Sequence, residues 1–278
     1  MFGRVALMGW LLAVLGGCTG LFFQPMKDHV ADPATFGFAY EDVTFEAADG
    51  TGLHGWFFPA EGERLGSLLF LHGNAENVST HFANVAWLAK AGVDVLIIDY
   101  RGYGRSAGSP TLEGLHLDAE AALDALIAMP ETDPERIAVF GQSLGGAIAL
   151  SVVAAHPAKD RLAALIVEGA FSDYRAIARE KLASFWLTWP LQWPFSLTID
   201  NAYSPSSSAG ALAPLPLLVI HGQRDDVVPP VHGERLFDAA NQPKAIWRPQ
   251  DVGHIQALAT LNMREQLTAW LGSRFADR

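Results

Sequence analysis

A serine between two glycines stands near the middle of the chain and has the surroundings of a nucleophile. Residues 141–145 read Gly-Gln-Ser-Leu-Gly, so Ser143 fits the pattern G-x-S-x-G. The residues before it predict a strand at 136–140, and the apolar run after it predicts a helix at 144–155. Glycines on both sides leave room for a sharp turn that points the hydroxyl outward. We therefore expect Ser143 to be a catalytic nucleophile.

A serine hydroxyl needs a base, and His254 is the candidate. An imidazole can accept the serine proton and return it near neutral pH. His254 follows the flexible Gly253 and would open a last helix over about 255–272, from which its ring reaches back to Ser143. Histidine in turn needs a carboxylate that fixes its tautomer. Asp225 and Asp226 both follow a predicted strand, so either could supply it.

The elements that must position these residues alternate between strands and helices. This alternation predicts a mainly parallel eight-stranded sheet with helices on both faces, and an early hairpin as its antiparallel edge. The expected strands are 42–47, 53–58, 67–71, 93–98, 136–140, 162–167, 215–220 and 245–248, and the expected helices are 78–91, 111–129, 144–155 and 255–272.

From about residue 40 to the end, the chain resembles the α/β-hydrolase superfamily. Residues 71–75 (Leu-His-Gly-Asn-Ala), 99–106 (Asp-Tyr-Arg-Gly-Tyr-Gly-Arg-Ser) and 141–146 are similar to its monoacylglycerol-lipase-like and serine-aminopeptidase-like branch. The resemblance implies an α/β-hydrolase fold with a small helical cap, and the chain order Ser, Asp, His for the catalytic residues. Residues 221–229 fit the family pattern H-G-x-x-D-x-x-V-P, which selects Asp225 over Asp226.

The same resemblance implies an oxyanion hole beside the serine. In this fold the backbone amide after the nucleophile, here that of Leu144, acts with an amide from the loop after the third strand. In this chain the second donor is Asn74 or Ala75, and the sequence leaves that choice open. His72 lies in the same loop, and we expect it to brace the loop rather than act as a second base.

A segment at about 171–209 interrupts the alternation and is interpreted as a cap over the active site. It is rich in aromatic residues, of which Trp186, Trp189 and Trp193 are the candidates for binding an apolar acyl group. They could also touch lipid, or pack the cap onto its own domain.

The amino terminus is typical of a bacterial lipoprotein. Residues 1–17 contain one charge, Arg4, and then an apolar stretch that is short for a membrane span. Residues 15–18 (Leu-Gly-Gly-Cys) resemble a lipobox, which implies cleavage before Cys18, its acylation, and anchoring to a membrane of the cell envelope, with the outer membrane favoured. The expected organisation is a signal peptide at 1–17, a lipidated lead-in at 18–40, and a hydrolase domain at 41–278.

Composition excludes several other classes. The formal net charge of -11 argues against nucleic-acid binding, because no basic surplus exists to neutralise phosphates. The single cysteine excludes an intrachain disulfide and a cysteine-based metal cluster. The histidines show no H-E-x-x-H spacing, and we expect no metal and no cofactor.

The sequence therefore predicts a serine hydrolase that cleaves esters or thioesters of an apolar acyl group, with a small-molecule ester or a lipid as substrate. An aminopeptidase is the first alternative. It needs a carboxylate for the substrate ammonium, and Glu168, Glu180 and Asp173 are available. The second alternative is a membrane-tethered binding protein that has lost catalysis on a hydrolase scaffold.

Overall fold

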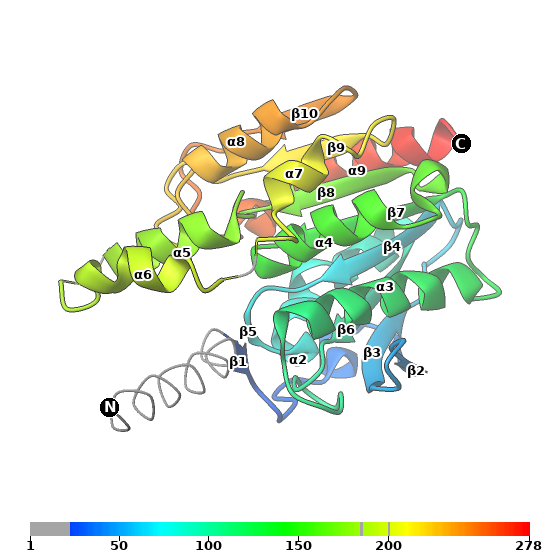
Figure 1. The fold of residues 1–278 in the computed structure, drawn as a ribbon. Coiled ribbons are helices and arrows are strands. Elements are labelled where there is room, and N and C mark those ends of the chain that lie inside the picture. Colours follow the sequence, from blue (N-terminus) through cyan, green and yellow to red (C-terminus); the bar gives the residue numbers. More distant parts are fainter. Residues whose placement is uncertain (1–22, 184–185, 200) are drawn as a thin grey trace.

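A central sheet carries the residues singled out above. The computed structural model describes residues 23–183, 186–199 and 201–278. Their main sheet has eight strands in the order β10-β9-β8-β7-β4-β6-β3-β2 (Figure 1). β2 and β3 form the expected antiparallel edge, β3 is antiparallel to β6, and the other neighbours run parallel. The predicted fold class is confirmed.

The strands lie close to the predicted ranges because most of them are apolar runs buried on both faces, as parallel sheets require. In β4, β6, β7, β8 and β9 every residue is buried. The strands of the main sheet are β2 (Glu41–Glu46), β3 (Gly52–Phe58), β4 (Gly66–Leu71), β6 (Val93–Asp99), β7 (Ile137–Gln142), β8 (Ala164–Glu168), β9 (Leu217–Ile220) and β10 (Lys244–Trp247), and a separate pair joins β1 (Gln24–Pro25) to β5 (Ala75–Glu76).

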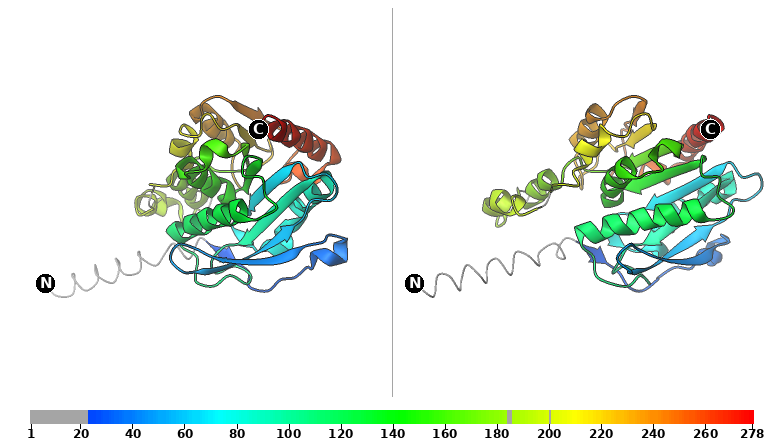
Figure 2. Two further views of the ribbon diagram at one scale, coloured as in Figure 1. Left: turned by 90° about the vertical axis from the view of Figure 1, so that its right-hand side faces the viewer. Right: turned by 45° about the vertical axis from the view of Figure 1, so that its right-hand side comes forward.

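Helices cover both faces of the sheet and enclose two apolar clusters. One cluster lies under α3, α4, α7 and α8, and the other lies under α2, α9 and the short 3₁₀ turns at 82–91 (Figure 2). The α-helices are α2 (Val78–His81), α3 (Leu112–Ala128), α4 (Leu144–Ala155), α5 (Tyr174–Ala183), α6 (Gln192–Ser196), α7 (Pro205–Ala209), α8 (Val231–Ala239) and α9 (Leu261–Ala276).

Two helix predictions need correction. The last helix starts at Leu261, where the Thr260 side chain accepts a hydrogen bond from the Met263 amide, and not at about 255. His254 therefore lies in a loop before this helix. The single helix expected at 78–91 is instead the four-residue α2 followed by 3₁₀ segments Phe82–Asn84 and Ala86–Ala91. It does end at Gly92, which has the left-handed conformation with φ 83°.

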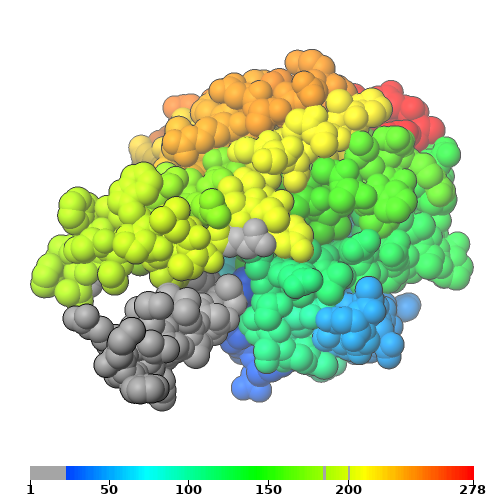
Figure 3. All heavy atoms as spheres, in the orientation of Figure 1, coloured from blue at the N-terminus to red at the C-terminus, as the bar shows by residue number. Residues whose placement is uncertain are grey.

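The cap is a short helical arm that projects from the body of the molecule (Figures 1 and 3). It consists of α5, a 3₁₀ turn at Trp189–Leu191 and α6, and it returns to the body through α7. Across the part of the chain that the structure describes, every helix is too short or too polar to span a bilayer.

Candidate active site

Ser143 occupies a strained turn between β7 and α4. Its φ of 52° and ψ of -115° are unusual for a residue with a side chain. A Cβ atom on Gly141 would collide with the carbonyl of Gly145, and a Cβ on Gly145 would collide with the carbonyl of Leu71. Both glycines are therefore required by close backbone contacts. These contacts hold Ser143 in its strained conformation at the start of α4, where the helix dipole favours negative charge.

His254 is paired with the carboxylate of Asp225. His254 Nδ1 lies 2.8 Å from Asp225 Oδ2, whereas Asp226 is exposed to solvent. Asp225 Oδ1 accepts the backbone amides of Val227 and Val228 at 2.9 and 2.8 Å. Burial opposes ionisation of this carboxyl, but hydrogen bonds with His221 and His254 hold its pKa well below the ordinary value. Asp225 is thus a fixed anion beside the imidazole.

The serine and the histidine both contact one short segment at the end of β8, Glu168 and Gly169. The amide of Ser143 donates to the carbonyl of Glu168 at 2.8 Å. The ring of His254 packs against Gly169, the residue after Glu168, since a Cβ atom built on Gly169 would lie 3.2 Å from the Cε1 atom of His254. Ile255 follows the histidine with a φ of 48°, a rare conformation for a β-branched residue. The ring is thus positioned by a loop whose backbone is strained at the residue that follows it.

Glu168 braces both loops, a role that the sequence did not reveal. Its side chain accepts hydrogen bonds from Gln142 Nε2 at 2.7 Å and from the amide of Ala257 at 2.8 Å. The first partner lies next to Ser143 and the second lies three residues after His254. Burial raises the pKa of this carboxyl, although the two hydrogen bonds act in the opposite direction. A pairing of this kind joins residues far apart in sequence, so local patterns cannot show it.

The loop expected to complete the oxyanion hole is held rigidly. Asn74 lines the same cavity as Ser143 and Leu144, while Ala75 belongs to β5. The Tyr103 hydroxyl donates to the Asn74 carbonyl at 2.7 Å, and His72 Nδ1 donates to the Gly73 carbonyl at 2.7 Å. Fixing these two carbonyls also fixes the directions of the amides of Asn74 and Ala75, because a peptide unit is planar.

His72 has the bracing position that was expected. It is fully buried, and burial lowers its pKa to about 3, so the ring is neutral at physiological pH. Its ring stacks on that of His81 at 5.0 Å between centroids. A buried neutral ring with its Nδ1 bound to a carbonyl supports the loop.

A largely apolar cavity of about 270 Å³ opens beside Ser143. It lies between the body and the base of the cap. Of the described residues that line it, none is acidic and Lys181 alone is charged. The other lining residues are Phe23, Asn74, Leu112, Ser143, Leu144, Phe171, Tyr174, Ile177, Ala178, Ile199, Val227 and Val228.

The cap tryptophans are not among these lining residues. Trp186, Trp189 and Trp193 are 78%, 59% and 61% exposed, so the structure does not bring them to the cavity as expected. The apolar lining from the cap comes instead from the inner side of α5, at Ile177 and Ala178, and from Ile199. Aromatic composition located the cap but could not indicate which of its side chains turn inward.

The lead-in before β2 is bound to the oxyanion loop. β1 pairs with β5 in parallel, and the amide of Gln24 donates to the Asn74 carbonyl at 3.4 Å. The Asn77 side chain donates to the carbonyls of Met26 and Asp28 at 3.1 and 2.8 Å. Phe23 extends this segment into the cavity wall. The lead-in is therefore part of the site's framework.

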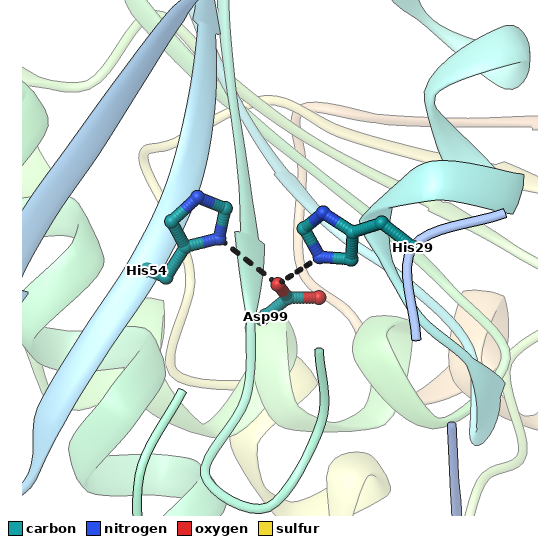
Figure 4. A group of neighbouring side chains, drawn as sticks. All are labelled: His29, His54 and Asp99. Atoms are coloured by element: carbon teal, nitrogen blue, oxygen red, sulfur yellow. Dashed lines mark hydrogen bonds and ion pairs between the residues drawn. The ribbon is translucent and has the colours of Figure 1, made fainter. Parts of the chain in front are cut away.

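A cluster of titratable side chains fastens the end of the lead-in. His29 Nε2 and His54 Nδ1 each lie 3.0 Å from Asp99 Oδ2, approaching it from two sides (Figure 4). The three possible ligand atoms lie within 4.8 Å of one another, a spacing that a metal ion could also use. Asp99 also accepts the amide of Val78 at 3.0 Å. These bonds give Asp99 a structural role.

The fold and this arrangement define a class of protein. A strained serine after the fifth strand of the main sheet and a histidine–aspartate pair in later loops are the arrangement of α/β hydrolases. The family model described as serine aminopeptidase, S33, matches residues 62–208, and the chain belongs to this family of α/β-hydrolase serine hydrolases.

Relatives from distant organisms agree with this assignment. The uncharacterized protein YfhR of Escherichia coli K12 is 31% identical over 96% of this chain and 95% of its own length. The α/β-hydrolase domain-containing protein WAV2 of Arabidopsis thaliana is 35% identical over 77% of this chain and 71% of its own length. Among solved structures, the Pyrococcus furiosus esterase Pf2001 matches with a TM-score of 0.70 at 22% identity, covering 92% of this chain and 97% of that one. This last match concerns the fold.

Proposed function

We propose that this hydrolase cleaves carboxylic esters or thioesters with an apolar acyl group, through an acyl-serine intermediate. The observation that carries the proposal is the cavity beside Ser143, whose described lining is apolar except for Lys181 and a few polar atoms. An acyl chain would bury its methylenes there, each contributing about 0.8 kcal/mol to binding.

The positions of the side chains support the following reaction. The Ser143 hydroxyl attacks the substrate carbonyl while His254 Nε2 takes its proton. His254 Nδ1 donates to Asp225, a bond that leaves Nε2 free to accept. The amide of Leu144 and an amide of the 73–75 loop donate to the tetrahedral oxyanion, and one such donor is typically worth about 2.7–4 kcal/mol. His254 then protonates the leaving alcohol or thiol, and a water molecule hydrolyses the acyl-serine by the same route.

An aminopeptidase remains the second candidate, because the matching family carries that description. The three carboxylates considered for an ammonium group all have other partners. Glu168 is bound by Gln142 and Ala257, Glu180 pairs with His232 at 2.8 Å, and Asp173 accepts from Asn201 at 2.7 Å. The described cavity lining contains none of them, which favours an acyl substrate.

A probe experiment and a substrate panel test the proposal. We expect a fluorophosphonate probe to label the wild type and to leave Ser143→Ala unlabelled. Against 4-nitrophenyl esters of increasing chain length, kcat/KM should rise with each added methylene by up to about fourfold until the cavity is full. Ala178→Phe, which adds a ring to the cavity wall, should shorten the preferred chain. Cleavage of aminoacyl-peptides with no cleavage of esters would support the aminopeptidase, and no labelling at all would support the inactive binding protein.

We also propose that the protein is anchored to an envelope membrane through lipid on Cys18. The proposal rests on residues 15–18 and on the short apolar stretch before them, which lie outside the described residues. Mass spectrometry of the mature amino terminus tests it. Diacylated Cys18 as the first residue is the expected result, and an intact Met1 or an unmodified Cys18 would refute it.

A further inference from the structure

The outer end of the cap carries a run of residues without charge. Residues 186–199, here called the cap tip, contain no Asp, Glu, Lys, Arg or His, although charged residues make up 18% of the chain. Large apolar side chains of the tip are exposed, which is costly unless something covers them. They are Trp186 (78%), Leu187 (60%), Trp189 (59%), Leu191 (55%), Trp193 (61%) and Leu197 (68%).

The cap tip lies on the arm that also forms one wall of the cavity. Ile177 and Ala178 on α5 line the cavity, and the chain leaves α5 to form the tip and returns to the cavity at Ile199. The arm projects away from the sheet in Figure 1 and in the right-hand view of Figure 2, and the tip is at its far end. A surface that covered the tip would therefore contact the far end of the arm whose base lines the cavity.

The described part of the chain begins at the same cavity. Phe23 lines it, and Cys18 is five residues earlier in the sequence. Five residues reach at most about 17 Å when fully extended. The 22 residues before Phe23 include the apolar stretch 5–15 and one charged residue. The described chain thus begins at this cavity with Phe23, and the cap tip joins the same cavity at Ile199.

We propose that the cap tip docks into the interfacial region of a lipid bilayer and holds the cavity entrance at the membrane surface. Tryptophan is enriched at such interfaces because its ring is apolar and its N–H remains polar. The tip has no charged residue of its own to desolvate, and the guanidinium of Arg179, on α5, lies 4.8 Å from the centroid of the Trp193 ring. The rest of the chain is acidic, so attraction to anionic lipid does not drive this contact. Binding is apolar, and it occurs on zwitterionic phosphatidylcholine and is insensitive to salt.

A local fluorescent probe tests the contact independently of hydrolysis. The full-length chain with Ser143→Ala, which cannot degrade the lipid, receives Leu191→Cys and an environment-sensitive nitrobenzoxadiazole label. The matched control carries Leu261→Cys, because Leu261 is 75% exposed but lies at the start of α9. The parent chain without a new cysteine gives the signal from Cys18, which is subtracted. Each protein is mixed with phosphatidylcholine vesicles at low and at high salt.

The expected result is a blue shift and a severalfold rise in emission at position 191 with vesicles, at both salt concentrations, and none at position 261. Three outcomes would overturn the proposal. In the first, the emission of the label at position 191 does not change when vesicles are added. In the second, its emission is already blue-shifted without vesicles and the shift depends on protein concentration, as when a second copy covers the tip. In the third, its emission is blue-shifted without vesicles at every protein concentration, as when the chain's own amino-terminal segment covers the tip.

Hydrolysis provides a second measurement, which rests on the proposed function. The double variant Leu187→Asp/Leu191→Asp places charges on the tip, and both positions lie outside the described cavity lining. We expect its kcat/KM on a soluble short-chain ester to stay within about twofold of the wild type, and its rate on an ester embedded in vesicles to fall by about tenfold or more. Equal rates of the wild type and the double variant on the embedded ester would contradict membrane docking. If the wild type hydrolysed neither the soluble nor the embedded ester, the proposed function would be contradicted instead.

Discussion

Asp225 has two sets of partners, and each stabilises its negative charge. Its Oδ2 atom faces His254, and its Oδ1 atom accepts two backbone amides from the same loop. Because the pKa of this carboxyl is lowered in the folded protein, its contribution to stability is present above its unfolded pKa of about 3.9 and is lost as pH falls through the lower folded value. The aspartate is therefore ionised throughout the pH range in which His254 can act as a base.

The first prediction concerns this carboxylate. We expect Asp225→Asn to lower kcat by about 10⁴-fold, because an amide no longer selects the tautomer whose Nε2 accepts the serine proton. Steady-state hydrolysis of a short 4-nitrophenyl ester measures the effect. Asp226→Asn is the matched control, since Asp226 is exposed and adjacent, and its kcat should change by less than about twofold. Comparable losses of kcat in the two variants would show that the effect does not come from the Asp225–His254 pair.

The second prediction concerns Glu168. Glu168→Gln keeps the shape of the side chain but presents a donor NH₂ toward the donors of Gln142 or Ala257. We expect a loss of about 1–3 kcal/mol in the free energy of unfolding and a fall in kcat of tenfold or more, because the serine turn and the histidine loop lose their common brace. Urea unfolding and ester hydrolysis measure the two effects. Glu135→Gln, on an exposed turn, should change neither.

At the scale of elements, the lead-in and the hairpin β2–β3 are joined to the core by one charged network. His54 on β3 lies between Asp99, at 3.0 Å from Nδ1, and Asp42, at 2.7 Å from Nε2. Burial opposes protonation of this ring, but its two carboxylate partners raise its pKa. Two further side chains contact these carboxylates: His29 Nε2 lies 3.0 Å from Asp99, and Arg105 pairs with Asp42 at 3.0 Å. His54 thus ties Asp99, which anchors the lead-in, to the edge of the sheet, and protonation of its ring would strengthen both contacts.

The third prediction is a pH dependence of stability. A histidine whose pKa is higher in the folded than in the unfolded protein stabilises the fold fully at pH values below its unfolded pKa of about 6.5. This stabilisation is lost as pH rises through the pKa of the folded protein. We expect His54→Gln to lower the free energy of unfolding by about 1.5–3 kcal/mol near pH 5.5, and the difference from wild type to shrink toward pH 9. Urea unfolding at graded pH measures it.

His116→Gln is the control for this trend. Burial lowers the pKa of His116 to about 4, so its linkage has the opposite sign and the wild type gains stability as pH rises toward 6.5. A difference for His54→Gln that grew with pH would contradict the proposed charge state.

The sequence predicted those elements whose signal is local. Strand β7, the serine turn and helix α4 were predicted to within two residues because a glycine pattern and two apolar runs adjoin there. The final helix was placed too early because the 3₁₀ turn Ala257–Ala259 continues its apolar pattern before Thr260 caps it. Tertiary contacts left no local signal. The roles of Glu168 and Tyr103, and the outward direction of the cap tryptophans, depend on segments that meet only in the folded chain.

At the scale of the whole molecule, the net charge acts on every substrate that approaches. The formal charge is -11, and residues 1–22 contain a single charged residue, Arg4, so residues 23–278 carry -12. A field of this sign repels anionic molecules over about 30 Å at 0.01 M salt and over less than 10 Å at physiological salt. Lys181 at the cavity is a short-range positive charge within this negative field.

The fourth prediction distinguishes neutral from anionic acyl substrates by their response to salt. Raising KCl from about 0.01 to 0.3 M shortens the screening length severalfold, so the repulsion of a distant anion is largely removed. We expect kcat/KM for a 4-nitrophenyl monoester of a dicarboxylic acid to rise severalfold, while that for the uncharged ester of equal length changes little. The ratio of the two cancels any general effect of salt on the enzyme. A ratio that fell with salt would mean that Lys181 attracts the substrate's charge more strongly than the rest of the surface repels it, and Lys181→Met should then abolish the salt response.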